Sequence, residues 1–154
     1  VELASMPEDK LYRHSMPLST FFVGPGKTRK SLCELVTCVR IPVPGAGHVS
    51  RFYKHGTRPA LDISTISIGV AGNYRDGVLS QVRVAFGAVA PTPLRAELTE
   101  QALEGRRLDA AAIENAAAIA RDEVNPINDV RASAWYRKEM IHNMTKRILE
   151  NVSA

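Results

Sequence analysis

The chain has 154 residues, 45% of them hydrophobic and 23% charged, which is enough for one domain with a buried core and a short piece of another. A net charge of +4 favours anionic partners only weakly. Because the basic residues are spread along the chain among four Phe, four Tyr and one Trp, we do not expect a nucleic-acid surface. No apolar run is long enough to span a membrane. Two cysteines, Cys33 and Cys38, are too few for a metal set and are expected to be reduced, partly buried thiols of a cytoplasmic protein.

The first residues predict a β-hairpin. Strands from Val1 to Ser5 and from Leu11 to Met16 flank a turn at residues 7–10, and Pro17 is suited to the first turn of a short helix. A hairpin of this size is not stable alone, so we expect its sheet partners to come from upstream residues or from another chain. Since a strand already begins at Val1, we interpret the chain as a piece of a longer polypeptide.

Four further strands are expected, at residues 35–42, 49–54, 62–71 and 78–89. A turn at residues 72–77 joins the last two as a hairpin. Alternation in the last strand indicates one buried face, formed by Val78, Ser80, Val82, Val84, Phe86 and Ala88. The strands therefore predict an antiparallel meander with one buried and one wetter face.

Helices follow the strands. Thr92 is a candidate N-cap before Pro93 and Gly105 a candidate stop, while Asp109 is suited to cap a second helix. The second helix has an apolar stripe of Ile113, Ala116, Ala117, Ala120 and Val124, and a third, from about residue 133 to 151, has one of Ile141, Met144, Ile148 and Val152. The predicted fold class is α+β, with an antiparallel β meander followed by three helices packed on one face.

The segment from Phe52 to Ile63 carries the most informative charges. Lys54 and Arg58, four residues apart, are suited to an anion or an electron-rich ring, and Asp62 is placed to hold the guanidinium of Arg58. The alternative is an ordinary surface strand with its charged side chains in water.

Other candidate motifs point to structural roles. The Gly24-Pro25-Gly26-Lys27-Thr28 segment lacks the leading glycine and spacing of a phosphate loop and is interpreted as a turn. The histidines show no metal-ligand spacing, and no nucleophile elbow is present. Trp135 is interpreted as a core or interface anchor, beside a helix-capping network of Asp129, Arg131, Tyr136 and Arg137. We therefore expect no catalytic residues and no metal site in this chain.

Five sequence blocks, in order, carry a family resemblance. They are residues 21–28 (FFVGPGKT), 34–42 (from ELV to IP), 52–63 (FYKHGTRPALDI), 84–93 (VAFGAVAPTP) and 131–137 (RASAWYR). Together they closely resemble the C-terminal part of the FAD-binding (medium) subunit of molybdenum hydroxylases, nearest to bacterial xanthine dehydrogenase. The resemblance covers essentially the whole chain.

The resemblance implies an electron-transfer role. In that family a molybdenum-cofactor subunit hydroxylates the substrate, and electrons pass through [2Fe–2S] clusters of an iron–sulfur subunit to FAD and then to NAD or another acceptor. It implies that residues 1–42 end the FAD-binding domain and that residues 48–154 form the C-terminal domain. It also implies two cofactor-binding residues, Val36 against the flavin and Lys54 near its reducible edge. Arg58 and Asp62 are weaker candidates for supporting Lys54 or the domain interface.

The chain departs from the family in one respect, because it contains no Ala-Gly-Gly-Thr or Gly-Gly-Asn type segment for the FAD pyrophosphate. We therefore expect an incomplete FAD site that needs the upstream half of the FAD-binding domain, and a chain that is inactive in isolation. The alternatives are a non-catalytic interaction module that stabilises such a complex, or the flavin subunit of a relative acting on an aldehyde, carbon monoxide, nicotinate or an aromatic thioester.

Overall fold

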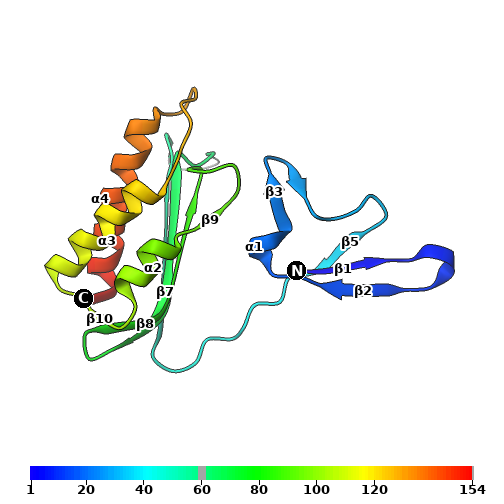
Figure 1. The fold of residues 1–154 in the computed structure, drawn as a ribbon, viewed down its shortest axis with the longest axis horizontal. Coiled ribbons are helices and arrows are strands. Elements are labelled where there is room, and N and C mark those ends of the chain that lie inside the picture. The colour runs from blue at the N-terminus through cyan, green and yellow to red at the C-terminus, as the bar shows by residue number, and fades with distance from the viewer. Residues whose placement is uncertain (59–61, 154) are drawn as a thin grey trace. The chain divides into compact units, whose positions relative to one another are not determined.

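A computed structural model describes residues 1–58 and 62–153, which divide into two compact units, Val1–Pro44 and Gly45–Ala154 (Figure 1). Residues 59–61 of the charged segment lie outside the described residues. Each unit has its own sheet, and the fold class is α+β, as the sequence predicted.

The first unit is built on a three-stranded sheet of order β2-β1-β5. The predicted hairpin is confirmed, because β1 (Glu2–Ser5) pairs antiparallel with β2 (Tyr12–Ser15). The expectation about its partner was wrong, since β5 (Leu35–Cys38) of the same chain pairs with the other edge of β1. Cys38 pairs with Glu2, the first residue of β1, so the strand predicted to reach residue 42 ends where its partner ends.

The remainder of the first unit is short. Helix α1 (Leu18–Phe21) leads into β3 (Phe22–Gly24), which pairs with β4 (Lys27–Thr28) across the glycine-rich turn predicted in place of a phosphate loop. Cys33 is exposed rather than partly buried, because it lies in a turn before β5, whereas Cys38 is half-buried.

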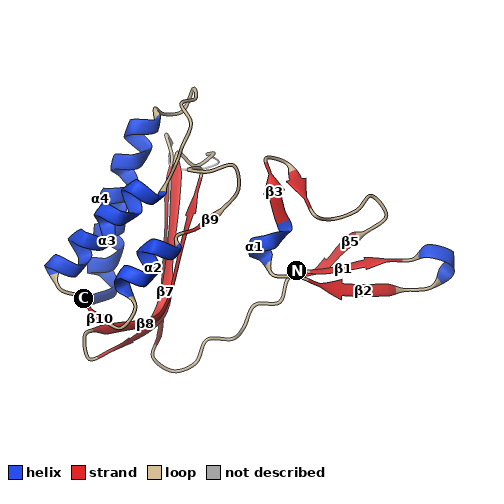
Figure 2. Ribbon diagram, viewed as in Figure 1, coloured by secondary structure: helices blue, strands red, loops and turns tan. Residues whose placement is uncertain are grey.

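The second unit has a five-stranded antiparallel sheet (Figure 2). Its path is β10 (Arg106–Arg107), β8 (Val78–Gly87), β7 (Ile66–Arg75) and β6 (His48–His55), and β9 (Leu94–Arg95) also pairs with β8. The meander is thus β6-β7-β8, and the first of the four expected strands belongs to the other sheet. Strand β7 begins at Ile66 instead of residue 62 because Asp62 takes part in the preceding turn.

A β-bulge corrects the predicted alternation of β8. Ala71 pairs with Arg83 and Asn73 with Ser80, so that Gln81 (φ 51°) and Val82 together oppose the single residue Gly72. The extra residue shifts the alternation at the start of the strand, so Leu79 is buried on the same side as Val82, whereas the predicted Val78 and Ser80 are not buried. Ala88, which follows the last residue of the strand, is exposed.

Three helices, α2 (Glu97–Leu103), α3 (Ala110–Glu123) and α4 (Ala134–Ser153), cover one face of this sheet (Figure 2). Thr92 is not the N-cap of the first of these, because residues 94–95 pair with β8 and the helix starts after Ala96. The predicted Asp109 cap is confirmed, since its Oδ1 accepts a hydrogen bond from the backbone of Ala112 at 2.8 Å. Gly105, in the left-handed region at φ 67°, follows α2 as predicted.

The core of the second unit lies between these helices and the sheet. The whole predicted stripe of α3 is buried, and α4 buries Ile141, Ile148 and Val152 with Met144 partly covered. On β6, Val49 and Tyr53 pack against this core. Because side chains alternate along a strand, Phe52 and Lys54 project from the opposite, open face of the sheet. Among the described residues, no helix is long and apolar enough to cross a membrane.

Candidate functional site

The C-terminal end of β6 positions the candidate cation on the open face of the sheet. Phe52 lies opposite Gly69 and Lys54 opposite Ser67 on β7. The Phe52 ring is largely exposed, and it would lie in ordinary contact with a Cβ at Gly69. The paired positions on β7 are therefore small, and both side chains remain exposed.

Lys54 is held by the turn that follows β6. Its Nζ donates a hydrogen bond of 2.6 Å to the backbone carbonyl of Asp62. The Asp62 carboxylate in turn accepts hydrogen bonds from the backbone amide of Thr57, from Thr57 Oγ1 at 3.1 Å and from the backbone amide of Arg58 at 3.0 Å. One residue thus closes the turn with its side chain and holds the ammonium with its carbonyl.

The predicted ion pair between Arg58 and Asp62 is present but long. Arg58 Nε lies 3.8 Å from Asp62 Oδ1, and the arginine side chain is exposed. Because an exposed pair at this distance contributes little, the backbone amides hold the carboxylate more firmly than the guanidinium does. Partial burial would raise the pKa of Asp62, but the hydrogen bonds from Arg58 and Thr57 outweigh it, so its pKa lies below the usual value.

The start of α4 reaches back to the same end of the sheet. Tyr136 Oη lies 3.3 Å from His55 Nε2, so the first turn of the helix contacts the last residue of β6. The predicted capping network is present: Ser133 Oγ accepts from the backbone of Tyr136 at 3.1 Å, and Asp129 Oδ1 accepts from Arg137 Nη2 at 2.7 Å. That hydrogen bond from Arg137 is the largest cause of a strongly lowered pKa at Asp129.

Two features of the first turn of α4 were not expected from the sequence. Arg137 is buried, with its side chain 4% exposed, and it also donates to the carbonyl of Ile127 at 3.0 Å. Trp135 is 70% exposed, so it is not a core residue. The buried Arg137 therefore holds the loop before α4, while Trp135 is exposed. The role of Trp135 as an interface anchor stays a prediction.

Val36 lies in the other unit. It is paired with Leu3 across β1 and β5, and its side chain is 46% exposed. The two candidate flavin-contacting residues thus come from separate compact units, each with an accessible side chain. Over residues 1–58 and 62–153, no group of three or more His, Cys, Asp or Glu side chains could hold a metal ion.

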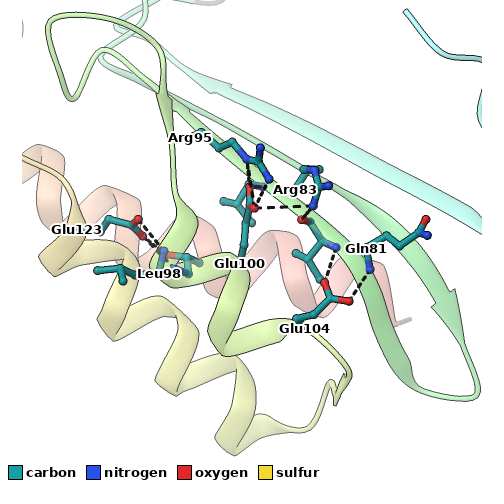
Figure 3. A network of polar contacts seen from close by, with 10 residues as sticks. Gln81, Arg83, Arg95, Leu98, Glu100, Glu104 and Glu123 are labelled. Carbon is teal, nitrogen blue, oxygen red and sulfur yellow. Dashed lines mark hydrogen bonds and ion pairs between the residues drawn. The ribbon is translucent and has the colours of Figure 1, made fainter. Parts of the chain in front are cut away.

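The most extensive polar network was not foreseen (Figure 3). Glu104, the C-cap residue directly after α2, accepts hydrogen bonds from the backbone amides of Gln81 and Val82, each at 2.8 Å. Glu100 accepts from the backbone amide of Val84 at 3.0 Å and from Arg95 Nε and Nη2 at 2.9 and 2.8 Å. These carboxylates bond the β8 amides that lie between the stretches paired with β10 and β9.

This network is structural rather than catalytic. Each carboxylate is fully engaged, and hydrogen bonds from the Arg95 side chain and the Val84 amide outweigh the burial that would raise the pKa of Glu100. The i, i+4 spacing of Glu100 and Glu104 is the only trace of the network in the sequence. It did not identify β8 as the partner, because the bulge that turns these amides toward α2 has no clear sequence signal.

The chain is similar to flavin-binding subunits of several oxidoreductases. Residues 51–152 match the model of the CO dehydrogenase flavoprotein C-terminal domain. The chain is 32% identical over 140 residues to the xanthine dehydrogenase FAD-binding subunit of Escherichia coli O157:H7, an alignment that covers 90% of this chain and 48% of that protein. It is 35% identical over 121 residues to the carbon monoxide dehydrogenase medium chain of Afipia carboxidovorans, with 79% and 42% covered.

A solved structure shows the same fold. A chain of carbon monoxide dehydrogenase from Hydrogenophaga pseudoflava superimposes with a TM-score of 0.84 at 30% identity, covering 95% of this chain and 50% of that one. The chain thus spans about half the length of the relatives it matches. The family model covers well over half of the chain, in the unit that contains β6 and Lys54. The chain therefore belongs to the CO dehydrogenase flavoprotein C-terminal domain family, the C-terminal part of the FAD-binding subunits of molybdenum hydroxylases.

Proposed function

We propose that this chain contributes the C-terminal part of the flavin subunit of a xanthine-dehydrogenase-like molybdenum hydroxylase. Residues 1–42 end its FAD-binding domain and residues 48–154 form its C-terminal domain. The observation that carries the proposal is the exposed Lys54 ammonium, held at the end of β6 by the carbonyl of Asp62, within the unit that matches the family model.

The described residues fit part of an FAD site. When bound, FAD would accept electrons one at a time from the [2Fe–2S] clusters and deliver them to an acceptor. Lys54 supplies a positive charge that stabilises the negative charge of the reduced ring, and Val36 supplies an accessible apolar surface for the ring face. The chain lacks the family's glycine-rich phosphate segments, so these contacts are assigned to the upstream half of the domain.

The same proposal assigns the partners. A subunit with the molybdenum cofactor and a subunit with [2Fe–2S] clusters assemble with the flavin subunit in the cytoplasm, and NAD is the electron acceptor. The relatives include a xanthine dehydrogenase subunit and a carbon monoxide dehydrogenase subunit at comparable identity. Because substrate choice resides in the molybdenum subunit, the purine substrate rests on the sequence resemblance, and an aldehyde, carbon monoxide, nicotinate or aromatic thioester is the alternative.

A second candidate function is an interaction module that does not touch the cofactor. The observation that favours it is the apolar surface at the start of α4, where Ile127 and Val130 of the preceding loop and Trp135 of the helix are 70%, 99% and 70% exposed. Arg137 and Asp129 hold this loop in one conformation, so its apolar side chains are presented without a large ordering cost on binding.

Replacing Lys54 by Met in the assembled enzyme separates the two candidates. If Lys54 lies by the flavin, K54M lowers the FAD reduction potential and changes the rate of NAD reduction while the subunits still assemble. Lys27→Met, at an exposed lysine of the first unit, is the matched control. An unchanged potential in K54M would exclude the flavin-pocket assignment and favour the interaction module.

The incomplete site is tested by titrating FAD into the chain with and without the upstream half, followed by flavin absorbance. We expect weak or no binding alone and saturable binding when the upstream half is added. Tight binding to the chain alone would show that the pyrophosphate contacts lie within these residues.

A further inference from the structure

We propose that Asp62 is a positioning residue for Lys54, and that Gly56 and Thr57 build the turn that lets it act. The positioning itself rests on contacts within the second unit, whereas its consequence for the flavin rests on the proposed function. The family resemblance gives Asp62 only as one of two weaker candidates for supporting Lys54, and it assigns no role to Gly56 or Thr57.

Lys54 needs such a residue because its side chain is long and lies on an exposed strand. A lysine side chain has four rotatable bonds, and an exposed one samples many rotamers, so its charge is spread over a wide volume. The 2.6 Å hydrogen bond from Nζ to the Asp62 carbonyl restricts the ammonium of Lys54 to positions near the end of β6. A carbonyl is also a neutral acceptor, so it holds the ammonium without cancelling its charge.

The carbonyl can hold Lys54 only if residue 62 is itself held. Its carboxylate accepts three hydrogen bonds from Thr57 and Arg58, which fastens residue 62 to the residues directly after β6. The backbone amide of Thr65 closes the ladder by donating to the carbonyl of His55 at 2.8 Å. The acceptor for Lys54 is thus connected to the strand that carries Lys54.

Gly56 makes room for this arrangement. A Cβ at position 56 would overlap the Asp62 carboxylate and displace it from the amides of Thr57 and Arg58. The glycine is required here for close approach and not for its backbone angles, since it is not among the glycines with positive φ. An alanine at position 56 is therefore expected to disturb the hydrogen bonds between the Asp62 carboxylate and the amides of Thr57 and Arg58, without any change at Asp62 itself.

The first test measures the reactivity of the Lys54 amine in the 154-residue chain. Acetylation by a water-soluble N-hydroxysuccinimide ester, quantified by mass spectrometry, is expected to be about threefold to tenfold faster at Lys54 in Asp62→Ala, as losing one hydrogen bond implies. G56A is expected to show the same direction, T57A a smaller effect, and D62N an intermediate one because it keeps an acceptor oxygen. Asp122→Ala on α3 is the matched control, and Lys27 serves as the internal reference for reagent dose.

An unchanged Lys54 acetylation rate in both D62A and G56A would overturn the positioning of Lys54 by Asp62. Circular dichroism shows whether each variant is folded. If D62A does not fold, G56A and T57A still test the proposal because they leave the carboxylate in the chain.

The second test measures the FAD reduction potential of the assembled flavin subunit in K54M, D62A and the double variant. We expect both single variants to lower the potential, D62A less than K54M, and the double variant to match K54M because Asp62 acts through Lys54. A shift in K54M with none in D62A would overturn the positioning role for the flavin. Faster acetylation in D62A with no shift in K54M would support the positioning of Lys54 and refute the proposed function.

Discussion

The two units bury their apolar side chains to very different degrees. In the second unit the helices and the sheet enclose a continuous core that includes Ile68, Phe86 and Ile141. In the first unit the buried hydrophobic side chains among the described residues are Leu3 and Phe21, while Leu35, Ile41 and Val43 are largely exposed. Since burial of apolar area is the main stabilising contribution, the second unit has the core of a domain, whereas the first unit buries few apolar side chains of its own.

The sheets also differ in how their edges are protected. In the second unit, Glu100 of α2 and Glu104, its C-cap residue, bind backbone amides of β8 that would otherwise be free to pair with another strand. In the first unit, β5 is an edge strand with Leu35 73% exposed and Val36 46% exposed. The β8 edge of one sheet is thus capped by side chains, whereas the β5 edge of the other carries exposed apolar side chains, which fits the flavin-facing role proposed for Val36.

The largest expected effect comes from the core of the second unit. Phe86→Ala removes a ring that is 1% exposed and is expected to cost about 3–5 kcal/mol of the free energy of unfolding, from lost burial and the cavity left behind. Denaturant unfolding followed by circular dichroism measures the loss. A cost below about 1 kcal/mol would contradict a single packed core between helices and sheet.

The second effect tests the buried carboxylate of α2. Glu100→Ala leaves the Val84 amide and the Arg95 guanidinium without their acceptor, and we expect a loss of about 2–3 kcal/mol, typical of hydrogen bonds to a charged group. Glu97→Ala, one turn earlier on the same helix and exposed, is the matched control. Equal unfolding free energies for the two variants would show that Glu100 does not stabilise the β8 edge.

The core was predictable from the sequence because apolar spacing alone defines it. The stripe on α3 and most of that on α4 were found from their helical period, and the β1–β2 hairpin from its turn. The burial of Leu79 was not predicted because the bulge at Gln81 shifts the alternation, and no residue type at this position indicates a bulge. The N-cap was misplaced because pairing of Leu94 and Arg95 with β8 overrides the local preference of Thr92 and Pro93 for a helix start.

The candidate site was predictable in part. Lys54 and Asp62 were identified as chemistry-bearing residues, but the sequence suggested that Asp62 holds Arg58, whereas its carboxylate mainly binds backbone amides. Every residue type except proline carries a backbone N–H donor, so hydrogen bonds from a side chain to backbone amides cannot be predicted before the conformation of the turn is known. The same reason explains why Glu104 was not identified.

A smaller effect is expected at acidic pH. The amides of Val82 and Gln81 hold the pKa of Glu104 below its ordinary value of 4.5, so its contribution to stability is present above that value and is lost as the pH falls through the lowered pKa of the folded state. Glu104→Gln is expected to cost about 1 kcal/mol near neutral pH and to reduce the loss of stability between neutral and acidic pH. Unfolding free energies of both proteins across this range check the sign. The same pH dependence in both would show that Glu104 is not a source of it.

The smallest effect distinguishes the two units most directly. Leu35→Ala shortens a side chain that is already 73% exposed, so the free energy of unfolding of the chain should change by less than about 0.5 kcal/mol. If β5 presents its apolar residues to a partner surface, the same substitution weakens assembly with the upstream half of the domain, as loss of buried apolar area at an interface does. Thermal unfolding of the chain and titration with the upstream half measure the two quantities separately. A change in stability without a change in assembly would mean that Leu35 packs within the first unit, and the contrast between the capped β8 edge and the exposed β5 edge would then be wrong at Leu35.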